Sequence, residues 1–334
     1  ILSMIMFTFG RGSASWFMNT VVSEENTFST GTLEIGIGDG EKNIGTIDLE
    51  GLAPEKVLEQ KIRIINNGTL PCKLYGIRFS AERINDLKEL NDALKFQIYL
   101  SNTKKEEITA LEIPVFCNYV GTILEDLIIF YPVTIDEEIQ MVFRAELDMM
   151  QVEEKHSEVD AITLQFELLA SQLSTPLQQL SERYLFLENY LDTQTAMSSI
   201  KDADILIIGE GPYECDRLLL KNKKNISIVG VWELNKPELK YMESNNIKTG
   251  NKDQYFLKVE DCSGAIIRDI SLSYHKENMI DSNEVKDSGI KPKKPFYVDK
   301  CFNYVNIDLK GEFENQLVED EGRENIILIN GARL

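Results

Sequence analysis

Alternating hydrophobic and polar positions predict a series of short β-strands in the first half of the chain. Between Asn26 and Ser80 three such segments follow one another, with apolar side chains at every second position. More segments of the same period follow up to Leu168. Their apolar positions are Leu33, Ile35, Ile37; Ile62, Ile64; Tyr75, Ile77, Phe79; Phe96 to Leu100; Leu127 to Tyr131; Ile139, Met141, Phe143, Ala145, Leu147; and Ile162, Leu164, Phe166, Leu168.

These strands predict a β-sandwich, because each half-buried strand needs a second sheet to cover its apolar face. Asn66-Asn67-Gly68 separates the second and third strands, and an Asn-Gly pair tolerates the positive φ of a tight turn. One helix is expected to interrupt the sandwich between Ser80 and Leu94, where apolar residues recur at helical spacing and Ser80 can cap the start.

Several short motifs follow one another in the first half of the chain. They are Asn26-Thr27-Phe28-x-x-Gly31-Thr32-Leu33, Leu52-x-Pro54, Asn66-Asn67-Gly68-x-Leu70 and a closing segment from Ala161 to Gln172. In this order they resemble the TasA/camelysin family. The resemblance implies a secreted Ig-like or jelly-roll sandwich over residues 15–173. Several members of that family assemble into extracellular biofilm fibres, so self-association or pairing with related matrix subunits is expected.

The first residues favour export. Ile1 to Phe9 is hydrophobic but too short to span a bilayer, and small residues from Gly12 to Ser15 follow it. We therefore expect residues 1–14 to be the remnant of a signal peptide whose start is missing, with cleavage close to Ala14. The alternative is a mature first strand that pairs with a neighbouring subunit.

The segment that follows the expected cleavage exposes two adjacent aromatic residues, which are costly to leave in water. The family resemblance implies that this segment is a donor strand inserted into the next subunit of a fibre. A first strand that pairs within its own domain uses the same sequence chemistry and is an equal alternative. The donor-strand candidates are Trp16, Phe17, Met18, Val21 and Val22.

The second half changes character after an expected helical connector at residues 174–194. Thr175-Pro176 precedes apolar residues at helical spacing, which predicts a capped amphipathic helix. A short helix, an apolar strand at Ile205 to Ile208 and a Gly209-x-Gly211-x-Tyr213 turn then resemble the opening of a right-handed parallel β-helix of the pectin-lyase superfamily. We expect residues 195–334 to form such a β-helix, incomplete at its C-terminus.

An internal repeat supports the β-helix prediction. Segments beginning near Leu218, Leu257, Tyr297 and Leu317 align with one another. Asn or Gly occupies the same corner of each, where a left-handed bend is expected. The corner residues are Asn225, Gly264, Asn303 and Asn325, and the same alignment places Cys262 beside Cys301.

Enzymes of the pectin-lyase superfamily act on polysaccharides through Asp, Lys or Arg side chains that project from one sheet. By resemblance, four polar residues of this chain are candidates for such a face, although alternation alone also places polar residues there for solvation. No motif singles out a catalytic residue. The β-helix face candidates are Asp261, Arg268, Asp269 and Asp308.

Charge and cysteine usage narrow the possible functions. The 334-residue chain has a net charge of −20, which argues against nucleic-acid binding because phosphates would be repelled. Its five cysteines lack the close pairs of a structural zinc site. Cys72 and Cys117 either form a disulfide or are two small buried thiols.

The sequence predicts no cofactor. A zinc protease needs two histidines one helical turn apart and a glutamate, whereas this chain has only His156 and His275. Calcium is compatible with acidic pairs such as Glu106-Glu107, but these lack the alternating spacing of a calcium loop.

Two functional hypotheses follow. The leading one is a secreted, non-enzymatic surface or matrix protein, with a TasA-like sandwich that anchors or polymerises and a β-helix that faces glycans or neighbouring subunits. The alternative is a secreted polysaccharide-acting enzyme whose sandwich is an attachment module.

Overall fold

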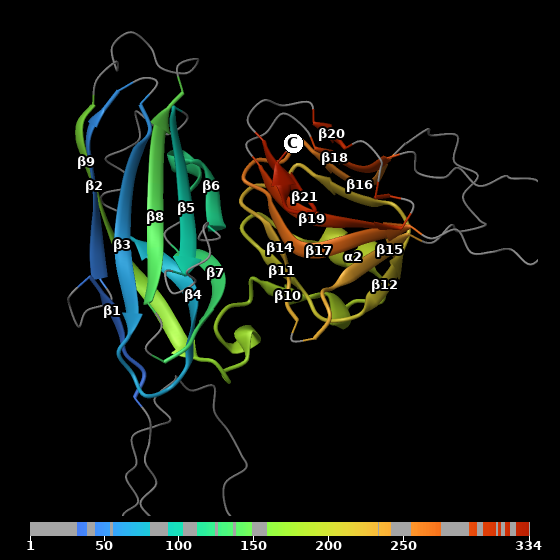
Figure 1. Cartoon of the computed structure of the whole chain (residues 1–334), viewed down its shortest axis with the longest axis horizontal. Helices are drawn as coiled ribbons and strands as arrows, with labels where there is room; N and C mark the ends of the chain where they lie inside the picture. Colours follow the sequence, from blue (N-terminus) through green and yellow to red (C-terminus); the bar gives the residue numbers. More distant parts are fainter. Residues whose placement is uncertain are drawn as a thin grey trace, which may run out of the picture.

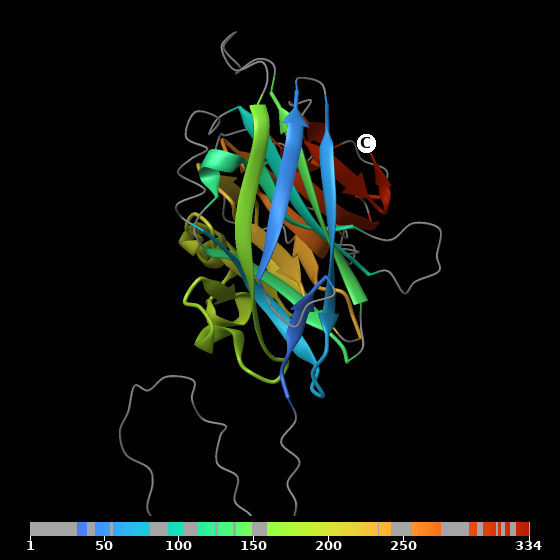
Figure 2. The same cartoon turned by 90° about the vertical axis from the view of Figure 1, so that its left-hand side faces the viewer.

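The computed structural model folds into two bodies, an all-β sandwich and a stack of parallel coils (Figure 1). Viewed from the sandwich side, the coils lie behind its strands (Figure 2). The structure describes residues 32–38, 44–53, 56–80, 93–102, 112–123, 126–135, 138–148, 159–232, 234–241, 255–274, 294–298, 303–311, 313–314, 318–320 and 325–333.

Two antiparallel sheets form the sandwich, as predicted for an all-β chain. One sheet has the order β1 (Ile35–Ile37), β3 (Leu58–Asn66), β8 (Glu138–Leu147), β5 (Leu94–Asn102) and β6 (Ile113–Tyr119). The other has the order β2 (Ile44–Leu52), β9 (Val159–Gln172), β4 (Cys72–Phe79) and β7 (Asp126–Val133). A 3-10 turn, η2 (Val120–Thr122), follows β6.

The core of the sandwich lies between the two sheets. In β8 the predicted alternation is confirmed, because every second residue from Ile139 to Leu147 is at most 1% exposed. Phe143 at its centre packs against Phe96 of β5 and Phe166 of β9, with ring centroids 6.0 and 5.3 Å away. Aromatic pairs at these separations add to the burial of apolar area that holds the sheets together.

The Asn66-Asn67-Gly68 corner forms, but not for the predicted reason. Neither Asn67 nor Gly68 is among the described residues with positive φ. The Gly68 N–H donates to Asn66 Oδ1 at 3.0 Å, and a Cβ at this position would lie 2.4 Å from the Thr32 carbonyl oxygen. Glycine is needed here because the chain before β1 passes close by.

A β-bulge in β4 corrects the predicted facing of Tyr75. The pairing of β4 with both neighbouring strands shifts register between Leu74 and Gly76. Leu74 and Ile77 therefore both point into the sandwich core, although alternation would place them on opposite faces. Tyr75 instead points outward, toward the coils.

The connector does not form the predicted helix. Residues 177–189 contain two 3-10 turns, η4 (Leu177–Gln179) and η5 (Leu187–Asn189), on either side of a strand, β10 (Tyr184–Phe186). Leu177, Tyr184 and Leu187 are buried as the spacing indicated, but Leu191 is fully exposed. Pairing of β10 with the first strand of the coils overrides the helical pattern.

The coils begin with α2 (Thr193–Ser199), which Asp192 caps by accepting the Thr195 N–H at 2.7 Å. Their strands form parallel ladders, apart from the final antiparallel β21–β22 pair. One ladder runs β13 (Leu218–Lys221), β16 (Tyr255–Glu260), β18 (Lys294–Val298), β20 (Glu319–Asp320). A larger sheet runs β10, β11 (Ile205–Ile208), β14 (Ser227–Gly230), β17 (Ile266–Tyr274), β19 (Tyr304–Gly311), β21 (Ile326–Ile329), β22 (Ala332–Arg333), with β12 (Pro212–Cys215) and β15 (Glu238–Tyr241) alongside.

The stacking reproduces the sequence repeat. Ile228, Ile267, Val305 and Ile327 face one another in successive strands and belong to one apolar core. Repeated apolar residues at equivalent positions of a coil bury a continuous core only when neighbouring coils stack. The repeat therefore indicated both the strands and their parallel partners.

Two of the four predicted left-handed corners are confirmed. Asn225 has a φ of 53° and Gly264 a φ of 71°. Asn303 and Asn325 are not among the described residues with positive φ. Their side chains instead form a ladder in which Asn303 Nδ2 donates to Asn325 Oδ1 at 3.2 Å and Asn303 Oδ1 accepts the Ala265 N–H at 2.9 Å.

The disulfide alternative is wrong, because Cys72 and Cys117 are both buried and no disulfide joins them. Cys262 is buried in the core of the coils, as expected for a small apolar side chain. Three predictions lie outside the described residues: the helical insertion apart from its ends, the position of Cys301, and the whole N-terminal segment with Trp16, Phe17, Met18, Val21 and Val22.

Candidate binding cleft at the junction of the two domains

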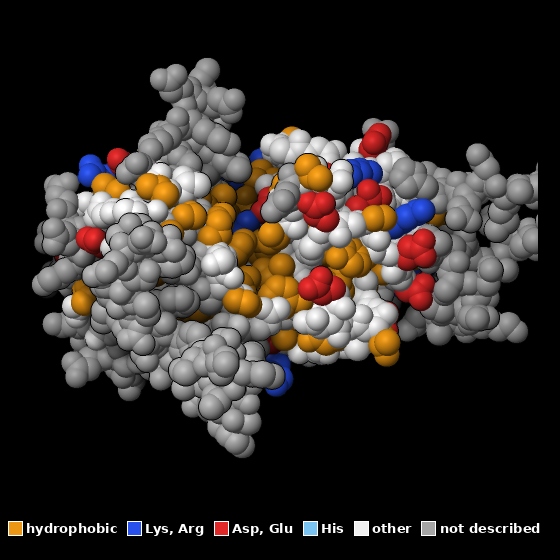
Figure 3. Space-filling view, turned by 90° about the horizontal axis from the view of Figure 1, so that it is seen from below, with side chains coloured by type: hydrophobic (Ala, Val, Ile, Leu, Met, Phe, Trp, Pro, Cys, Tyr) orange, Lys and Arg blue, Asp and Glu red, His pale blue; other side chains and the backbone are white. Residues whose placement is uncertain are grey.

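An apolar junction joins the sandwich to the coils. On the sandwich side Ile128 of β7 is buried, with Tyr75 and Phe130 beside it. Ile205, Ile207 and Val229 of the coils pack against them from β11 and β14, and so do Leu177, Leu180 and Tyr184 of the connector. Seen from below, apolar side chains gather along this junction (Figure 3).

Tyr184 of β10 connects the two bodies by hydrogen bonds. Its hydroxyl donates to the Tyr75 carbonyl at 2.9 Å and also contacts the Ile129 carbonyl. The bulge leaves Tyr75 without a register partner in either neighbouring strand, and the Tyr184 hydroxyl meets its carbonyl at this point. Burial raises the pKa of Tyr184, which stays a neutral donor.

Arg183, the residue before Tyr184, contacts β7, the strand that contains Ile129. Both terminal nitrogens of its guanidinium donate to the Asp126 carbonyl, at 3.2 and 3.1 Å. Its Nε is buried without a hydrogen-bond partner, and burial lowers the pKa of the side chain. Asp204 supplies a nearby negative charge, and burial raises the pKa of that carboxyl.

A second polar contact joins the corner of the coils to the sandwich. Asn118 Nδ2 donates to Asn225 Oδ1 at 2.7 Å, and Asn225 Nδ2 donates to the Thr122 carbonyl at 2.7 Å. A Cβ on Gly264 would lie 2.6 Å from both Asn118 Nδ2 and Asn225 Oδ1. Gly264 is therefore required both by its left-handed φ and by the approach of the sandwich.

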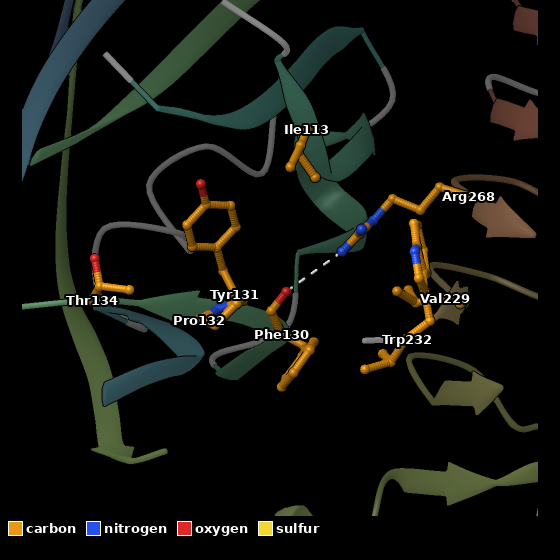
Figure 4. A pocket seen from close by; sticks show the side chains of 10 residues that line it. Ile113, Phe130, Tyr131, Pro132, Thr134, Val229, Trp232 and Arg268 are labelled. Carbon is orange, nitrogen blue, oxygen red and sulfur yellow. Dashed lines mark hydrogen bonds between the residues drawn. The ribbon is translucent and has the colours of Figure 1, made fainter. Parts of the chain in front are cut away.

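Beside the apolar junction lies an open cleft of about 410 Å³. Arg268 of β17 extends across it and donates to the Phe130 carbonyl at 3.5 Å (Figure 4). The same guanidinium forms an ion pair with Asp269. The lining residues are Ile113, Phe130, Tyr131, Pro132 and Thr134 of the sandwich, and Val229, Gly230, Val231, Trp232 and Arg268 of the coils.

Trp232 gives the cleft an accessible aromatic side chain. It is 39% exposed, and Lys236 Nζ lies 5.7 Å from the centroid of its ring. Lys236 also forms an ion pair with Asp308 at 2.9 Å. An apolar wall with one exposed indole and one guanidinium suits a ligand that combines an apolar face with a hydrogen-bond acceptor.

The four predicted face residues fall into three places. Arg268 and Asp269 are side by side at the cleft, where Arg268 contacts the sandwich rather than open solvent. Asp308 lies on β19 and pairs with Lys236. Asp261 follows β16 in a left-handed conformation, 3.8 Å from Lys221. They do not converge on one site.

The junction residues were not singled out from the sequence. Tyr184 belonged to a pattern that resembled a helix, and Asn118 and Trp232 carried no motif. The available signal for Trp232 was an indole directly after an apolar strand, and the signal for Asn225 was its place in the repeat. Neither of these two local signals indicates which distant segment the residue contacts.

The described residues do not fit a catalytic metal centre. Within the described ranges, no three His, Cys, Asp or Glu side chains are grouped closely enough to hold an ion. Both histidines, His156 and His275, lie outside those ranges. Among the helices that the structure describes, none is long and apolar enough to cross a membrane.

A family model described as camelysin metallo-endopeptidase matches residues 2–176, which is more than half of the chain. A search of curated proteins found no match.

Proposed function

The chain belongs to the camelysin metallo-endopeptidase family, and on this premise we propose that it is an extracellular structural protein rather than a protease. At family level, this membership supports a cell-surface or biofilm structural protein. Our proposal adds that the sandwich anchors or polymerises. It also adds that the coils, as a pectin-lyase-type β-helix, present a face to glycans or to neighbouring subunits.

The continuous junction between the two bodies carries this proposal. Six buried residues and the Tyr184, Arg183 and Asn118 hydrogen bonds fix the coils on the outer face of β4 and β7. An attachment module that only tethers an enzyme is usually joined through a polar linker with few contacts. A shared apolar junction instead suits a single rigid building block.

The side chains available as zinc ligands, or as acids and bases, favour the structural role over a zinc protease and over a polysaccharide-cleaving enzyme. The described residues do not fit the zinc site that the family's description implies. The four face candidates are dispersed, whereas polysaccharide cleavage needs acidic and basic groups around one bond. We therefore expect the purified protein to bind no stoichiometric zinc in equilibrium dialysis and to leave casein uncut. Submicromolar zinc binding together with zinc-dependent proteolysis would overturn the proposal.

Assembly is tested with the protein starting at Ser15. We expect filaments in negative-stain micrographs and light scattering that grows with concentration, because two aromatics at a free terminus gain a partner surface. Deleting Ser15 to Val22 should leave a folded monomer that binds the missing peptide added in trans. Leu191→Ser, which removes a fully exposed leucine from the connector, serves as the control and should assemble normally.

Monomers at every concentration, with the segment intact, would refute the assembly proposal. So would a deletion variant that unfolds, because the segment would then belong to its own domain. Location is tested separately by fractionating cells that express the full chain. We expect the protein in the medium or on the cell surface, and retention in the lysate would contradict export.

A further inference from the structure

The outer face of the β13–β16–β18 ladder is a second surface, remote from the junction in the sheet order. Its side chains come from strands in register, so that Leu219 lies beside Lys258 and Lys258 beside Tyr297. Neighbouring parallel strands are about 4.8 Å apart. A row of this kind offers repeated contacts along the stack to a linear polymer.

Aromatic rings and cations alternate on this surface. The rings of Tyr255 and Tyr297 lie 4.9 Å apart between their centroids. Lys258 Nζ is 5.3 Å from the Tyr297 centroid, and Lys294 Nζ is 6.0 Å from the Tyr255 centroid. We name Arg217, Leu219, Lys221, Tyr255, Lys258 and Lys294 the basic–aromatic face.

A hollow of about 260 Å³ opens on this face. Arg217, Tyr255 and Lys258 line it, with Leu219 at 42% exposed beside them. Gln194 and Glu260 add an amide and a carboxylate, both able to bind hydroxyl groups. The volume is small for a drug-sized ligand and suits a single sugar ring.

The charge of this face is opposite to that of the chain. The whole protein has a net charge of −20, yet the face has four cationic side chains against the carboxylates of Glu260 and Asp261. Glu260 accepts from both Lys221 and Lys258, at 3.1 Å each. A ligand carboxylate can replace Glu260 as the ion-pair partner of those lysines, whereas a neutral ligand forms no ion pair with them.

From these observations we propose that the basic–aromatic face binds a carboxylate-bearing polysaccharide, such as a uronate polymer. The half-buried Tyr255 ring packs against the C–H face of a sugar, and Arg217 and the lysines pair with the carboxylates. The inference rests on the proposed function in one respect, the assignment of glycan binding to the coils. It does not depend on assembly.

The test measures binding of an oligogalacturonate to the monomeric deletion variant and to the full chain by isothermal titration calorimetry. A neutral oligosaccharide of equal length and a single-stranded oligonucleotide of equal charge are the comparison ligands. We expect binding of the oligogalacturonate alone, weakening as salt is raised. Equal binding of the oligonucleotide would reduce the face to a general polyanion site and overturn the proposal.

Variants on opposite faces of the coils make the test specific. Arg217→Gln with Lys258→Gln should weaken binding by about tenfold or more, since two charge-assisted contacts are lost. Lys240→Gln with Lys310→Gln makes the same charge change on β15 and β19 and should leave affinity unchanged. Glu260→Gln removes the competing carboxylate and should tighten binding.

Equal losses in the two double variants would overturn the proposal, and so would weaker binding by Glu260→Gln. Absence of any binding would also do so while leaving fibre assembly untouched. Failure of assembly with intact glycan binding would refute the structural function alone.

Discussion

Removing the Tyr184 hydroxyl should weaken the junction without changing its shape. Tyr184→Phe keeps the buried ring but leaves the Tyr75 carbonyl, which lies at the bulge, without its donor. Losing a hydrogen bond while leaving its buried acceptor unpaired costs about 1–3 kcal/mol. Because both domains are expected to unfold as one unit of more than 250 residues, each kcal/mol should lower the melting temperature by roughly 2 °C or less.

Trp232 provides the assay because it lies at the junction. The chain has two tryptophans, so a Trp16→Phe background leaves Trp232 as the only indole. Urea unfolding followed by its fluorescence should coincide with unfolding followed by far-UV circular dichroism if both bodies unfold together. Tyr184→Phe should move both curves to lower urea by the same amount.

Tyr213→Phe is the matched control. The Tyr213 hydroxyl makes a long, exposed bond of 3.4 Å to the Glu210 carbonyl, so its loss should cost under about 0.5 kcal/mol. An equal loss in both variants would refute the reasoning. Two separate transitions in the parent protein would also refute it, because the junction would then not couple the two bodies.

Three further predictions concern the corner, a buried carboxyl and the thiols. Gly264→Ala should destabilise the protein by more than Gly331→Ala in thermal melts, because both have positive φ but only Gly264 has neighbours within 4 Å. Because burial raises the pKa of Asp204, its contribution to stability is present at acid pH and is lost as pH rises through the folded-state pKa, above 3.8. Relative to Asp204→Asn, the wild type should therefore lose unfolding free energy as pH rises through that window, and a constant difference would contradict this. No disulfide joins Cys72 to Cys117, so dithiothreitol should leave the melting temperature unchanged.

Sequence periodicity predicted the strands well where burial alone decides their facing. The predicted core positions recur at every second residue from Ile139 to Leu147, and each of them lies in the sandwich core. The repeat in the coils succeeded for the same reason, since Ile228 and Ile267 occupy equivalent buried positions. Local pattern and tertiary packing agree at these residues.

The errors arose where partners distant in sequence decide the conformation. Tyr184 resembled a helical residue because its burial comes from the sandwich and not from a helix core. Alternation predicts that Tyr75 faces the sandwich core with Ile77 and Phe79, but a bulge turns its side chain toward the coils. The repeat predicts left-handed corners at Asn303 and Asn325, whereas their amides extend a ladder between coils. The cleft combines residues more than 90 positions apart, which no local pattern can indicate.

The fixed junction has a consequence for imaging. A domain on a flexible tether takes many orientations, so averaging over particles blurs it out of a reconstruction. Here the coils are held by an apolar contact and by hydrogen bonds at two separate points. In any ordered array of sandwiches, the coils would repeat at one azimuth and one height, and a helical reconstruction would resolve them at the same helical symmetry as the sandwich.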